Sequence, residues 1–346
     1  MSELTRIVVD AMGGDYAPAE PVKGAVDALA ESDRIKVILT GDAAAIEKEL
    51  EKYSYPAERL EIVPTTQVIE TGEPPVKAIQ SKRDSSLVVG LNLVHKGEAD
   101  AFVSSGSTGA VLVGGQGIVK KIRGIQRAPL APLIPTAKGV SLLIDCGANV
   151  DARPSHLVQF AVLGSIYMKS IMGIENPRVG LVNIGTEEEK GNALCKETFP
   201  LLQACPDINF IGNVEARDIS AGAADVYVTE AFVGNVILKM YEGVGKTLLH
   251  AIKDALMSST RSKVGALLIK PALKSTLKKF DSSSYGGAPL LGLKGLVVKT
   301  HGSSKANEFR NTILQCIQFK EEDVNGKIQE FLAKQSAEKE AAADKE

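Results

Sequence analysis

Short apolar runs rich in β-branched residues alternate along the chain with longer segments in which apolar residues recur at helical spacing. The run Arg6–Asp10 is followed by such a segment at Pro18–Ala30, and Ile35–Thr40 is followed by another at Asp42–Tyr53. Further strands are predicted at Ile62–Pro64, Ala101–Ser104, Ser141–Asp145, Arg178–Asn183, Ile208–Ile211, Asp225–Val228 and Leu296–Thr300. Because these runs are almost continuously apolar, they indicate a mostly parallel sheet covered by helices on both faces. The pattern therefore predicts a layered α/β/α fold built from right-handed strand–helix–strand units.

Many of the predicted strands end in a loop of Gly, Ser, Asn or Asp. These loops are Ala11-Met-Gly-Gly-Asp15, Ser104-Ser-Gly-Ser-Thr-Gly109, Asp145-Cys-Gly-Ala-Asn149, Asn183-Ile-Gly-Thr186, Gly234-Asn235 and His301-Gly-Ser-Ser304. Open α/β sheets bind ligands at the carboxyl ends of their strands, and small residues let backbone N–H groups approach an anion. Any one loop is equally well a tight turn between a strand and a helix. Their repetition favours a shared anion site, with phosphate as the first guess.

Composition and charge narrow the class of protein. The chain has 40 basic and 42 acidic residues and a formal charge of -2, so it lacks the concentrated positive charge of a general nucleic-acid binder. Its four cysteines form no CxxC pair, which argues against a zinc ribbon or a disulfide scaffold. No leader pattern and no apolar run of about 20 residues is found. The expectation is a cytoplasmic enzyme.

Familiar nucleotide and metal motifs fail on inspection. Gly245-Lys246-Thr247 resembles the end of a phosphate-binding P-loop, but Met240 occupies the position where that motif needs glycine. Gly115-Gln-Gly117 lacks the last glycine of a dinucleotide fingerprint, because Lys120 stands there. Neither an HExxH pair nor a GxSxG elbow is present. The sequence therefore predicts no metal and no cofactor.

Two residues in polar loops, His301 and Lys190, are candidates for binding an anion or for catalysis. His301 follows a predicted strand and could be an acid, a base or an anion contact, whereas His156 follows Pro154 and is expected to start a helix. Lys190 could hold phosphate as a mobile point charge. The alternative is that its loop is a solvated helix start, in which Glu187–Glu189 are favoured by the helix dipole.

The segment Ala251–Phe280 has seven basic residues against the single acid Asp254, a net charge of +6, and many apolar residues lie between the charges. Pro271 is expected to break or kink any helix there. The segment could be a solvated pair of helices. Alternatively, it is a surface for an acidic partner or an anionic membrane, because basic amphipathic stretches bind both.

Several blocks of sequence, in order from Asp10 to about Arg310, closely resemble the bacterial phosphate acyltransferases of phospholipid synthesis. The blocks are Val9-Asp-Ala-Met-Gly-Gly-Asp15-Tyr-Ala-Pro18, Ser105-Gly-Ser-Thr-Gly-Ala110, Leu143-Ile-Asp-Cys-Gly-Ala-Asn-Val-Asp151, Ile184-Gly-Thr-Glu-Glu-Glu-Lys-Gly-Asn192, Phe210-Ile-Gly-Asn-Val-Glu-Ala-Arg217, Phe232-Val-Gly-Asn-Val236, Tyr285-Gly-Gly-Ala288 and His301-Gly-Ser-Ser304. One departure is Ser107, which stands where many members of that family have Asn. No departure removes a residue type that the chemistry requires.

The resemblance implies that long-chain acyl-ACP and inorganic phosphate give acyl phosphate and free acyl carrier protein, with a hand-off to a glycerol-3-phosphate acyltransferase. It also implies a fold like isocitrate and isopropylmalate dehydrogenases, a homodimer, and peripheral contact with the inner face of the cell membrane. In the family, a Lys at the position of Lys190 and an Asn at that of Asn235 are associated with catalysis. We expect Lys190 to orient phosphate and Asn235 to donate to the oxyanion.

The residues expected around phosphate are those of the polar loops. They are Asp10, Gly13, Gly14, Asp15, Ser105, Gly106, Ser107, Thr108, Gly109, Asn149, Gly185, Thr186, Asn213 and His301. The residues expected to face a membrane or the carrier protein are Lys263, Leu267, Leu268 and Lys270. Residues 1–330 are expected to form one catalytic unit, with 246–284 as a basic helical protrusion and 331–346 as a charged tail. Two alternatives are an isocitrate-dehydrogenase-like oxidoreductase and a non-catalytic membrane adaptor.

Overall fold

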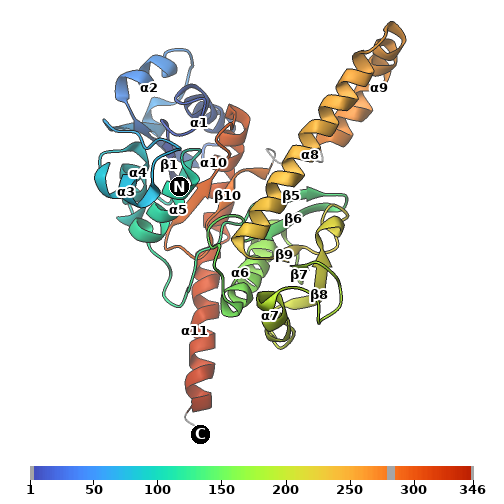
Figure 1. Cartoon of the computed structure of the whole chain (residues 1–346). Helices are drawn as coiled ribbons and strands as arrows, with labels where there is room; N and C mark the ends of the chain where they lie inside the picture. The colour runs from blue at the N-terminus through green and yellow to red at the C-terminus, as the bar shows by residue number, and fades with distance from the viewer. Residues whose placement is uncertain (1–3, 279–284, 344–346) are drawn as a thin grey trace.

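The computed structural model describes residues 4–278 and 285–343 and arranges them in two lobes, each built around one sheet (Figure 1). The strand order is β10-β11-β4-β1-β2-β3 in the first sheet and β5-β6-β9-β7-β8 in the second. The first sheet comprises β1 (Thr5–Asp10), β2 (Ile35–Gly41), β3 (Leu60–Pro64), β4 (Ala101–Ser104), β10 (Ala288–Pro289) and β11 (Leu296–Lys299). The second comprises β5 (Leu133–Thr136), β6 (Gly139–Ile144), β7 (Arg178–Asn183), β8 (Asn209–Glu215) and β9 (Val226–Val228).

Neighbouring strands of these two sheets run parallel, except in the edge pairs β10–β11 and β5–β6, which are antiparallel. The predicted α/β class with mostly parallel strands is therefore confirmed. The edge strands β5 and β10 were not predicted from the hydrophobic pattern. Each is short and contains a proline, Pro135 or Pro289, so neither produces a run that stands out from the surrounding loops.

The helices of the first lobe are α1 (Ala19–Glu31), α2 (Ala43–Leu50), α3 (Pro75–Ser81), α4 (Ser86–His95), α5 (Thr108–Gly114) and α10 (Ala306–Glu321). Those that follow the second sheet's strands are α6 (Pro154–Met172), α7 (Ala193–Gln203) and α8 (Ala231–Met257), with α9 (Thr260–Lys278) and the C-terminal α11 (Val324–Ala343) beyond them. Single turns of 3-10 helix lie at Ala57–Arg59 and Ala216–Asp218, and a π-helical turn at Gly115–Val119 extends α5. His156 lies in the first turn of α6, as predicted.

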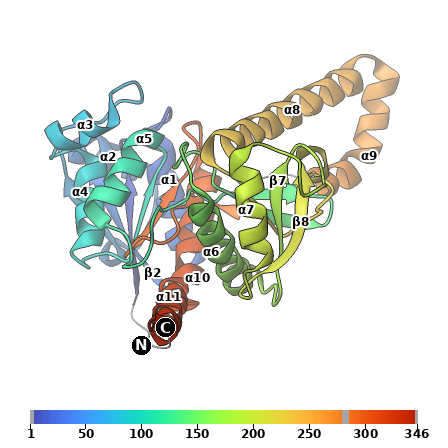
Figure 2. The same ribbon diagram turned by 60° about the horizontal axis from the view of Figure 1, so that its bottom comes forward.

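Alternate residues of β1 pack against opposite layers of helices. Ile7 and Val9 belong to the core that includes α1 and α10, while Val8 packs with residues of α4. Because successive strand residues point to opposite faces, a strand covered on both sides must be apolar throughout, as the pattern of β1 indicated. Figure 2 shows helices on both sides of this sheet.

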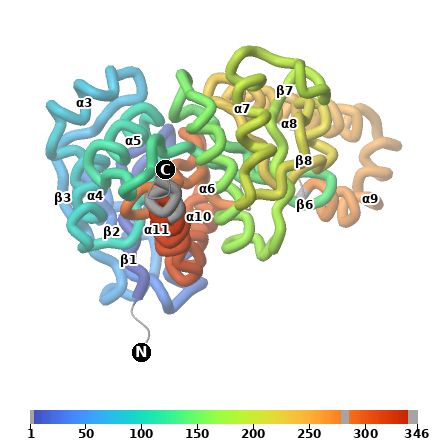
Figure 3. The backbone as a smooth tube through the Cα atoms, turned by 90° about the horizontal axis from the view of Figure 1, so that it is seen from below, coloured from blue at the N-terminus to red at the C-terminus, as the bar shows by residue number. Residues whose placement is uncertain are grey.

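The two lobes share one continuous apolar core. Buried residues from both sheets, among them Ile7 and Leu142, belong to the same cluster, together with Phe160 of α6 and Ile313 of α10. Helices α6, α10 and α11 lie between the lobes (Figure 3), and α6 contacts both of the others. The relative position of the two sheets is therefore held by side-chain packing as well as by the connecting chain.

Helices α8 and α9 form a hairpin that projects from the second lobe (Figure 1). We call residues 246–278 the arm. Residues 279–284 of the predicted protrusion, the first two of which also end the predicted basic segment, lie outside the described part of the chain. Of the two predicted effects of Pro271, a break or a kink, the break does not occur, because α9 continues through this residue. A proline inside a helix removes one backbone hydrogen bond. Here α9 also packs along α8, and this packing supports the helix. Among the described residues, no helix combines the length and apolar character needed to cross a bilayer.

Candidate active site

Three of the predicted polar loops meet at the carboxyl ends of β1, β4 and β11. The hydroxyl of Ser105 donates to the Gly13 carbonyl at 2.7 Å, and the backbone N–H of Asp15 donates to the Gly302 carbonyl at 2.8 Å. The N–H of Thr300 donates to the Ser104 carbonyl at 3.0 Å. The structure thus brings together loops that lie almost 300 residues apart, as the parallel sheet required.

Close approach of these loops explains the two glycines that follow β1. A Cβ atom on Gly13 would lie 2.6 Å from Oδ2 of Asp10 and 2.8 Å from the backbone N of Gly106. Gly14 has a φ of +92°, and a Cβ there would lie only 2.1 Å from the Ser105 hydroxyl oxygen. Only glycine combines this backbone angle with this lack of space. The loops therefore pack backbone to backbone.

Asp10 lies at the base of these loops and is almost completely buried. Its carboxylate accepts hydrogen bonds from the Ser104 hydroxyl at 2.7 Å and from the N–H of Met12 at 3.2 Å. Burial raises the pKa of Asp10 even though hydrogen bonds to serine hydroxyls and backbone N–H groups favour the charged form. Through its hydrogen bond to Ser104, Asp10 joins the carboxyl end of β1 to that of β4.

The loop Ser105–Gly109 leads into α5. The hydroxyl of Ser107 accepts from the N–H of Ala110 at 3.4 Å, which is the geometry of a helix N-cap. Asn is an equally good cap, so either residue type at this position can begin the helix. A Cβ on Gly109 would lie 2.5 Å from Cγ of Pro75, whereas Thr108 is exposed. Thr108 thus presents its side chain to solvent at the start of α5.

The candidate residues named from the sequence did not include Lys299 and Glu308. Lys299 is only 7% exposed, and its Nζ donates to the carbonyl of Thr300. Burial lowers the pKa of Lys299 to about 8, although the carboxylates of Glu308, Asp10 and Asp15 act in the opposite direction. Burial also raises the pKa of Glu308. One feature of the sequence could have identified Lys299: it is a single lysine at the end of an otherwise apolar strand that is predicted to be covered on both faces.

In the second lobe, Asp145 and Asn149 organise the loop after β6. The Asp145 carboxylate accepts from the N–H groups of Leu130, Ala148 and Asn149 at 2.8–3.1 Å. The side-chain amide of Asn149 donates to Asp145 at 2.7 Å and to the Ala128 carbonyl at 3.0 Å. Both residues are buried, so their polar groups serve to fix this loop.

The loop that carries Lys190 lies at the carboxyl end of β7. The side-chain amide of Asn183 donates to the Lys190 carbonyl at 3.1 Å, and that of Asn213 donates to the Glu187 carbonyl at 2.8 Å. These two hydrogen bonds hold the backbone of the loop against the carboxyl ends of β7 and β8. The side chains of Thr186 and Lys190 are exposed above it, and Gly185 allows Lys190 to fold close to its backbone.

Helix α8 begins against this part of the second lobe. Glu230 caps it by accepting from the N–H groups of Phe232 and Val233 at 2.6 and 2.9 Å. Gly234 lies directly against the Asp145 carbonyl, where a Cβ would be 1.9 Å from the oxygen. This contact fixes the position of Asn235, the next residue, relative to the loop after β6.

One face of α8 is turned toward the loops of the first lobe. Nε2 of His301 lies 3.9 Å from Oε2 of Glu242, and the charge of Lys239 acts on Lys299. Asn235 shares this face, because residues four and seven positions apart lie on the same side of a helix. We call the region formed by Asp10–Asp15, Ser104–Gly109, Lys299–Ser304 and Asn235–Glu242 the interlobe site. The described contacts do not include one between Lys190 and the first lobe.

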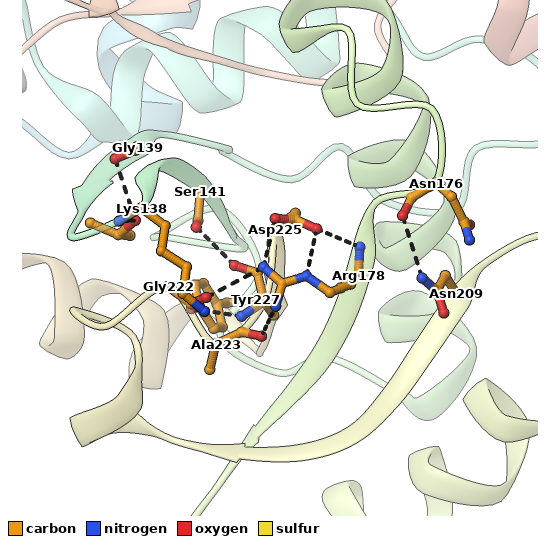
Figure 4. Close-up of polar contacts among 12 residues, drawn as sticks. Lys138, Gly139, Ser141, Asn176, Arg178, Asn209, Gly222, Ala223, Asp225 and Tyr227 are labelled. Atoms are coloured by element: carbon orange, nitrogen blue, oxygen red, sulfur yellow. Dashed lines mark hydrogen bonds and ion pairs between the residues drawn. The ribbon is translucent and has the colours of Figure 1, made fainter.

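The amino ends of the second sheet's strands carry a different polar network (Figure 4). Arg178 donates to both oxygens of Asp225 at 3.0–3.1 Å and also to the carbonyls of Ala223 and Gly222. A cavity of about 310 Å³ lies beside it. Because these groups already satisfy one another at the edge opposite to the ligand-binding ends of parallel strands, we assign them a structural role.

The predicted membrane-facing residues lie on α9 in the arm. Leu267 and Leu268 are 71% and 77% exposed, and Lys263 and Lys270 are exposed beside them. Val264 is also more than half exposed. Large exposed apolar side chains gathered among lysines are unusual on a protein surface.

Comparison with known proteins gives a consistent result. The family described as "Fatty acid synthesis protein" matches residues 5–327. The phosphate acyltransferase of Clostridium perfringens strain SM101 is 49% identical over 331 residues, 96% of this chain and 98% of that protein. That of Clostridium acetobutylicum is 48% identical over 322 residues, 93% of this chain and 97% of that protein.

Solved structures show the same fold at low sequence identity. A phosphotransacetylase from Streptococcus pyogenes matches with a TM-score of 0.61 and 18% identity, over 92% of this chain and 94% of its own. The EutD phosphotransacetylase from Staphylococcus aureus matches with a TM-score of 0.56 and 17% identity over the same shares. At these identities the likeness concerns the fold alone.

Proposed function

This chain belongs to the phosphate acyltransferase family of fatty acid synthesis proteins, and we propose that it transfers the acyl group of a long-chain acyl-ACP to inorganic phosphate. The C–S bond of the thioester breaks and a C–O bond to phosphate forms. The proton of hydrogen phosphate passes to the thiolate, so the products are acyl phosphate and the free carrier protein. The observation that carries the proposal is 49% identity to a phosphate acyltransferase over 96% of the chain. The comparisons do not favour an oxidoreductase.

Phosphate is proposed to bind at the first-lobe loops of the interlobe site. Gly13, Gly14 and Gly106 let the loops pack backbone to backbone there, and Thr108 presents its side chain at the start of α5. His301 is exposed at the edge of the same region and faces α8. Backbone N–H groups in such glycine-rich loops form concave anion sites, which suits a phosphate dianion.

Lys190 and Asn235 are proposed as the catalytic residues. An exposed lysine on a loop fixed from below can move to meet the phosphate and neutralise its charge. Asn235 lies on the face of α8 that is turned toward the first lobe, so its amide can donate to the oxyanion that develops on the thioester carbonyl. Catalysis would then consist mainly of holding two reactants in the correct geometry.

Direct transfer without an acyl-enzyme is the mechanism that we propose. Phosphate is already a nucleophile at neutral pH, so no activated side chain is required. Cys146 lies near the interlobe site, but burial raises its pKa, and the carboxylates of Asp145 and Glu242 raise it further. A thiol with a raised pKa is a poor nucleophile. A mass-tagged acyl-enzyme trapped in the absence of phosphate would exclude this mechanism.

The arm is proposed to contact an anionic membrane at the inner face of the cell membrane. Its exposed leucines and lysines would place the product, an acyl phosphate, near a glycerol-3-phosphate acyltransferase. The acidic carrier protein is proposed to dock on the same basic surface. We also propose that this chain acts as a homodimer with a fold like that of isocitrate dehydrogenase. If Lys263→Glu and Lys270→Glu leave the KM for acyl-ACP unchanged, the carrier docks elsewhere.

The decisive experiment is to follow phosphate-dependent release of the carrier-protein thiol from a long-chain acyl-ACP, with acyl phosphate identified by mass spectrometry. We expect both products only when phosphate is present. Thiol release without phosphate would identify a thioesterase instead. No release with acyl chains of several lengths would contradict the proposed activity, and a nicotinamide-binding assay would then test the oxidoreductase alternative.

A further inference from the structure

A buried ammonium group lies beneath the first-lobe loops, and the proposed chemistry does not use it. Lys299 ends β11 beside Ser104, the last residue of β4, and its side chain is only 7% exposed. Its Nζ donates to the carbonyl of Thr300. Lysine is rarely buried unless its charge is balanced, because removing an ammonium group from water is costly. Its surroundings therefore indicate what the charge does.

Three carboxylate residues from three parts of the chain gather at the end of β11. Asp10 accepts from the hydroxyl of Ser104, the register partner of Lys299. Asp15 donates its N–H to the Gly302 carbonyl, and Glu308 accepts from the N–H of His301. Asp10 lies at the end of β1, Asp15 lies in the loop that follows, and Glu308 belongs to α10. From the facing helix α8, the charge of Lys239 acts on Lys299 with the opposite sign to these carboxylates. Without the charge of Lys299, a phosphate dianion approaching the loops would meet uncompensated carboxylates and be repelled.

We propose that Lys299 is a positioning residue for phosphate, whose ammonium group neutralises the Glu308, Asp10 and Asp15 carboxylates so that the loops beside them accept the dianion. Its burial and its bond to Thr300 indicate that it acts through these carboxylates and does not touch the substrate. This inference deepens the proposed acyl transfer to phosphate and rests on it. Lys190, on an exposed loop of the other lobe, remains the proposed catalytic lysine.

The charge of Lys299 is expected to change in an accessible pH range. Its pKa is lowered to about 8 by burial, with Lys239 adding to the effect while Glu308, Asp10 and Asp15 oppose it. As pH rises through this value the ammonium group loses its proton, and the compensation of the carboxylates is lost. We therefore expect the KM for phosphate in the wild-type enzyme to rise above about pH 8, beyond the change caused by the ionisation of phosphate itself.

The test compares Lys299→Met with Lys294→Met, which removes an exposed lysine near the other end of the same strand. We expect Lys299→Met to raise the KM for phosphate by about 10-fold or more, with the KM for acyl-ACP within about 2-fold of wild type and no extra rise above pH 8. Lys294→Met should change neither constant. An unchanged KM for phosphate, or equal increases in both constants, would overturn the proposal.

A second variant tests whether Lys299 acts by neutralisation. Adding Asp15→Asn to Lys299→Met removes one of the carboxylates that the ammonium balances. The double variant should recover part of the lost phosphate affinity, because the two changes are coupled through one electrostatic interaction. Failure to recover any affinity in a folded double variant, judged by circular dichroism, would contradict neutralisation.

Binding measurements separate this inference from the proposed activity. Isothermal titration of the wild-type protein and of Lys299→Met with inorganic phosphate needs no acyl transfer. If the wild-type protein binds phosphate but releases no thiol, the proposed activity fails, while weaker binding by the variant still supports the role of Lys299. If both proteins bind phosphate equally, Lys299 has no such role, whatever the activity.

Discussion

Gly234 of α8 lies against the carbonyl oxygen of Asp145, so closely that a Cβ atom would be 1.9 Å from it. This contact joins the first turn of α8 to the loop after β6 and sets where Asn235 stands. The side chains of Lys239 and Glu242, farther along the same face, then reach the loops of the first lobe. The position of the α8 side of the interlobe site therefore depends on this close contact.

Replacing Gly234 by alanine should therefore both destabilise the protein and displace Asn235. We expect Gly234→Ala to lower the free energy of unfolding by about 2–3 kcal/mol, because backbone must move to relieve the overlap. The control is Gly243→Ala in the same helix, where no described atom beyond the helix itself lies within 4 Å. That change should stabilise the protein by up to about 1 kcal/mol. Urea unfolding measures both, and equal stabilities would refute the contact.

Asn235→Ala should reduce turnover without unfolding the protein. Loss of one oxyanion donor typically lowers kcat by about 10²–10³-fold, and the KM for phosphate should change little. The measurement is the phosphate-dependent release of carrier-protein thiol. Asn176→Ala, at an exposed position before β7, is the matched control and should keep wild-type turnover. If Asn235→Ala also turns over normally, Asn235 does not contact the transition state.

Lys190→Ala should lower kcat/KM by about 10²-fold or more if this lysine neutralises the phosphate in the transition state. Lys196→Ala is a suitable control, because Lys196 is exposed on the neighbouring helix α7. The loop itself should survive the change, since Asn183 and Asn213 bind its backbone carbonyls. Near wild-type kcat/KM would remove Lys190 from the proposed mechanism.

The ion pair of Arg178 and Asp225 should contribute to stability in a pH-dependent way. Burial alone would raise the pKa of Asp225, but the hydrogen bonds and charge of Arg178 outweigh it and hold that pKa below its usual range. The stabilisation is thus fully present above the unfolded-state pKa of about 3.9 and is lost as pH falls through the folded-state value.

Asp225→Asn should consequently cost about 1–2 kcal/mol at neutral pH, a modest value because the pair is only partly buried. The difference from wild type should shrink as the pH falls from about 5 to below 3. Urea unfolding at a series of pH values measures this, with Asp33→Asn at an exposed position as control. A difference that stays constant across this range would show that the carboxylate charge is not responsible.

The double change Leu267→Asp and Leu268→Asp should abolish binding to vesicles that contain anionic lipid. It removes two largely exposed apolar side chains and reduces the positive charge of the arm, which contributes about 1 kcal/mol per basic residue near such a surface. Co-sedimentation with vesicles is the measurement, and Leu201→Asp on α7 is the control. Unchanged sedimentation would exclude the arm as a membrane contact.

The sequence by itself determined the class of fold and most of its strands. Runs such as Arg6–Asp10 and Arg178–Asn183 have no polar residue between their two ends. Such an uninterrupted run is expected of a strand that is covered on both faces. It also located the polar loops, because a parallel sheet places the carboxyl ends of neighbouring strands at one edge. The hydrogen bonds of Ser105 to Gly13 and of Asp15 to Gly302 follow from this rule.

Only the tertiary structure decided which strands share a sheet and which charges meet. Hydrophobic periodicity reports whether a residue is buried but not which strand lies beside it, so the division into two sheets was not visible. Lys299 shows the same limit: its sequence position says that it ends a strand, but its burial among Asp10, Asp15 and Glu308 depends on three segments that are distant in the chain. Likewise, His301 and Glu242 face each other because Gly234 fixes α8 against the second lobe, and such long-range electrostatic and steric relations arise only when the lobes pack together.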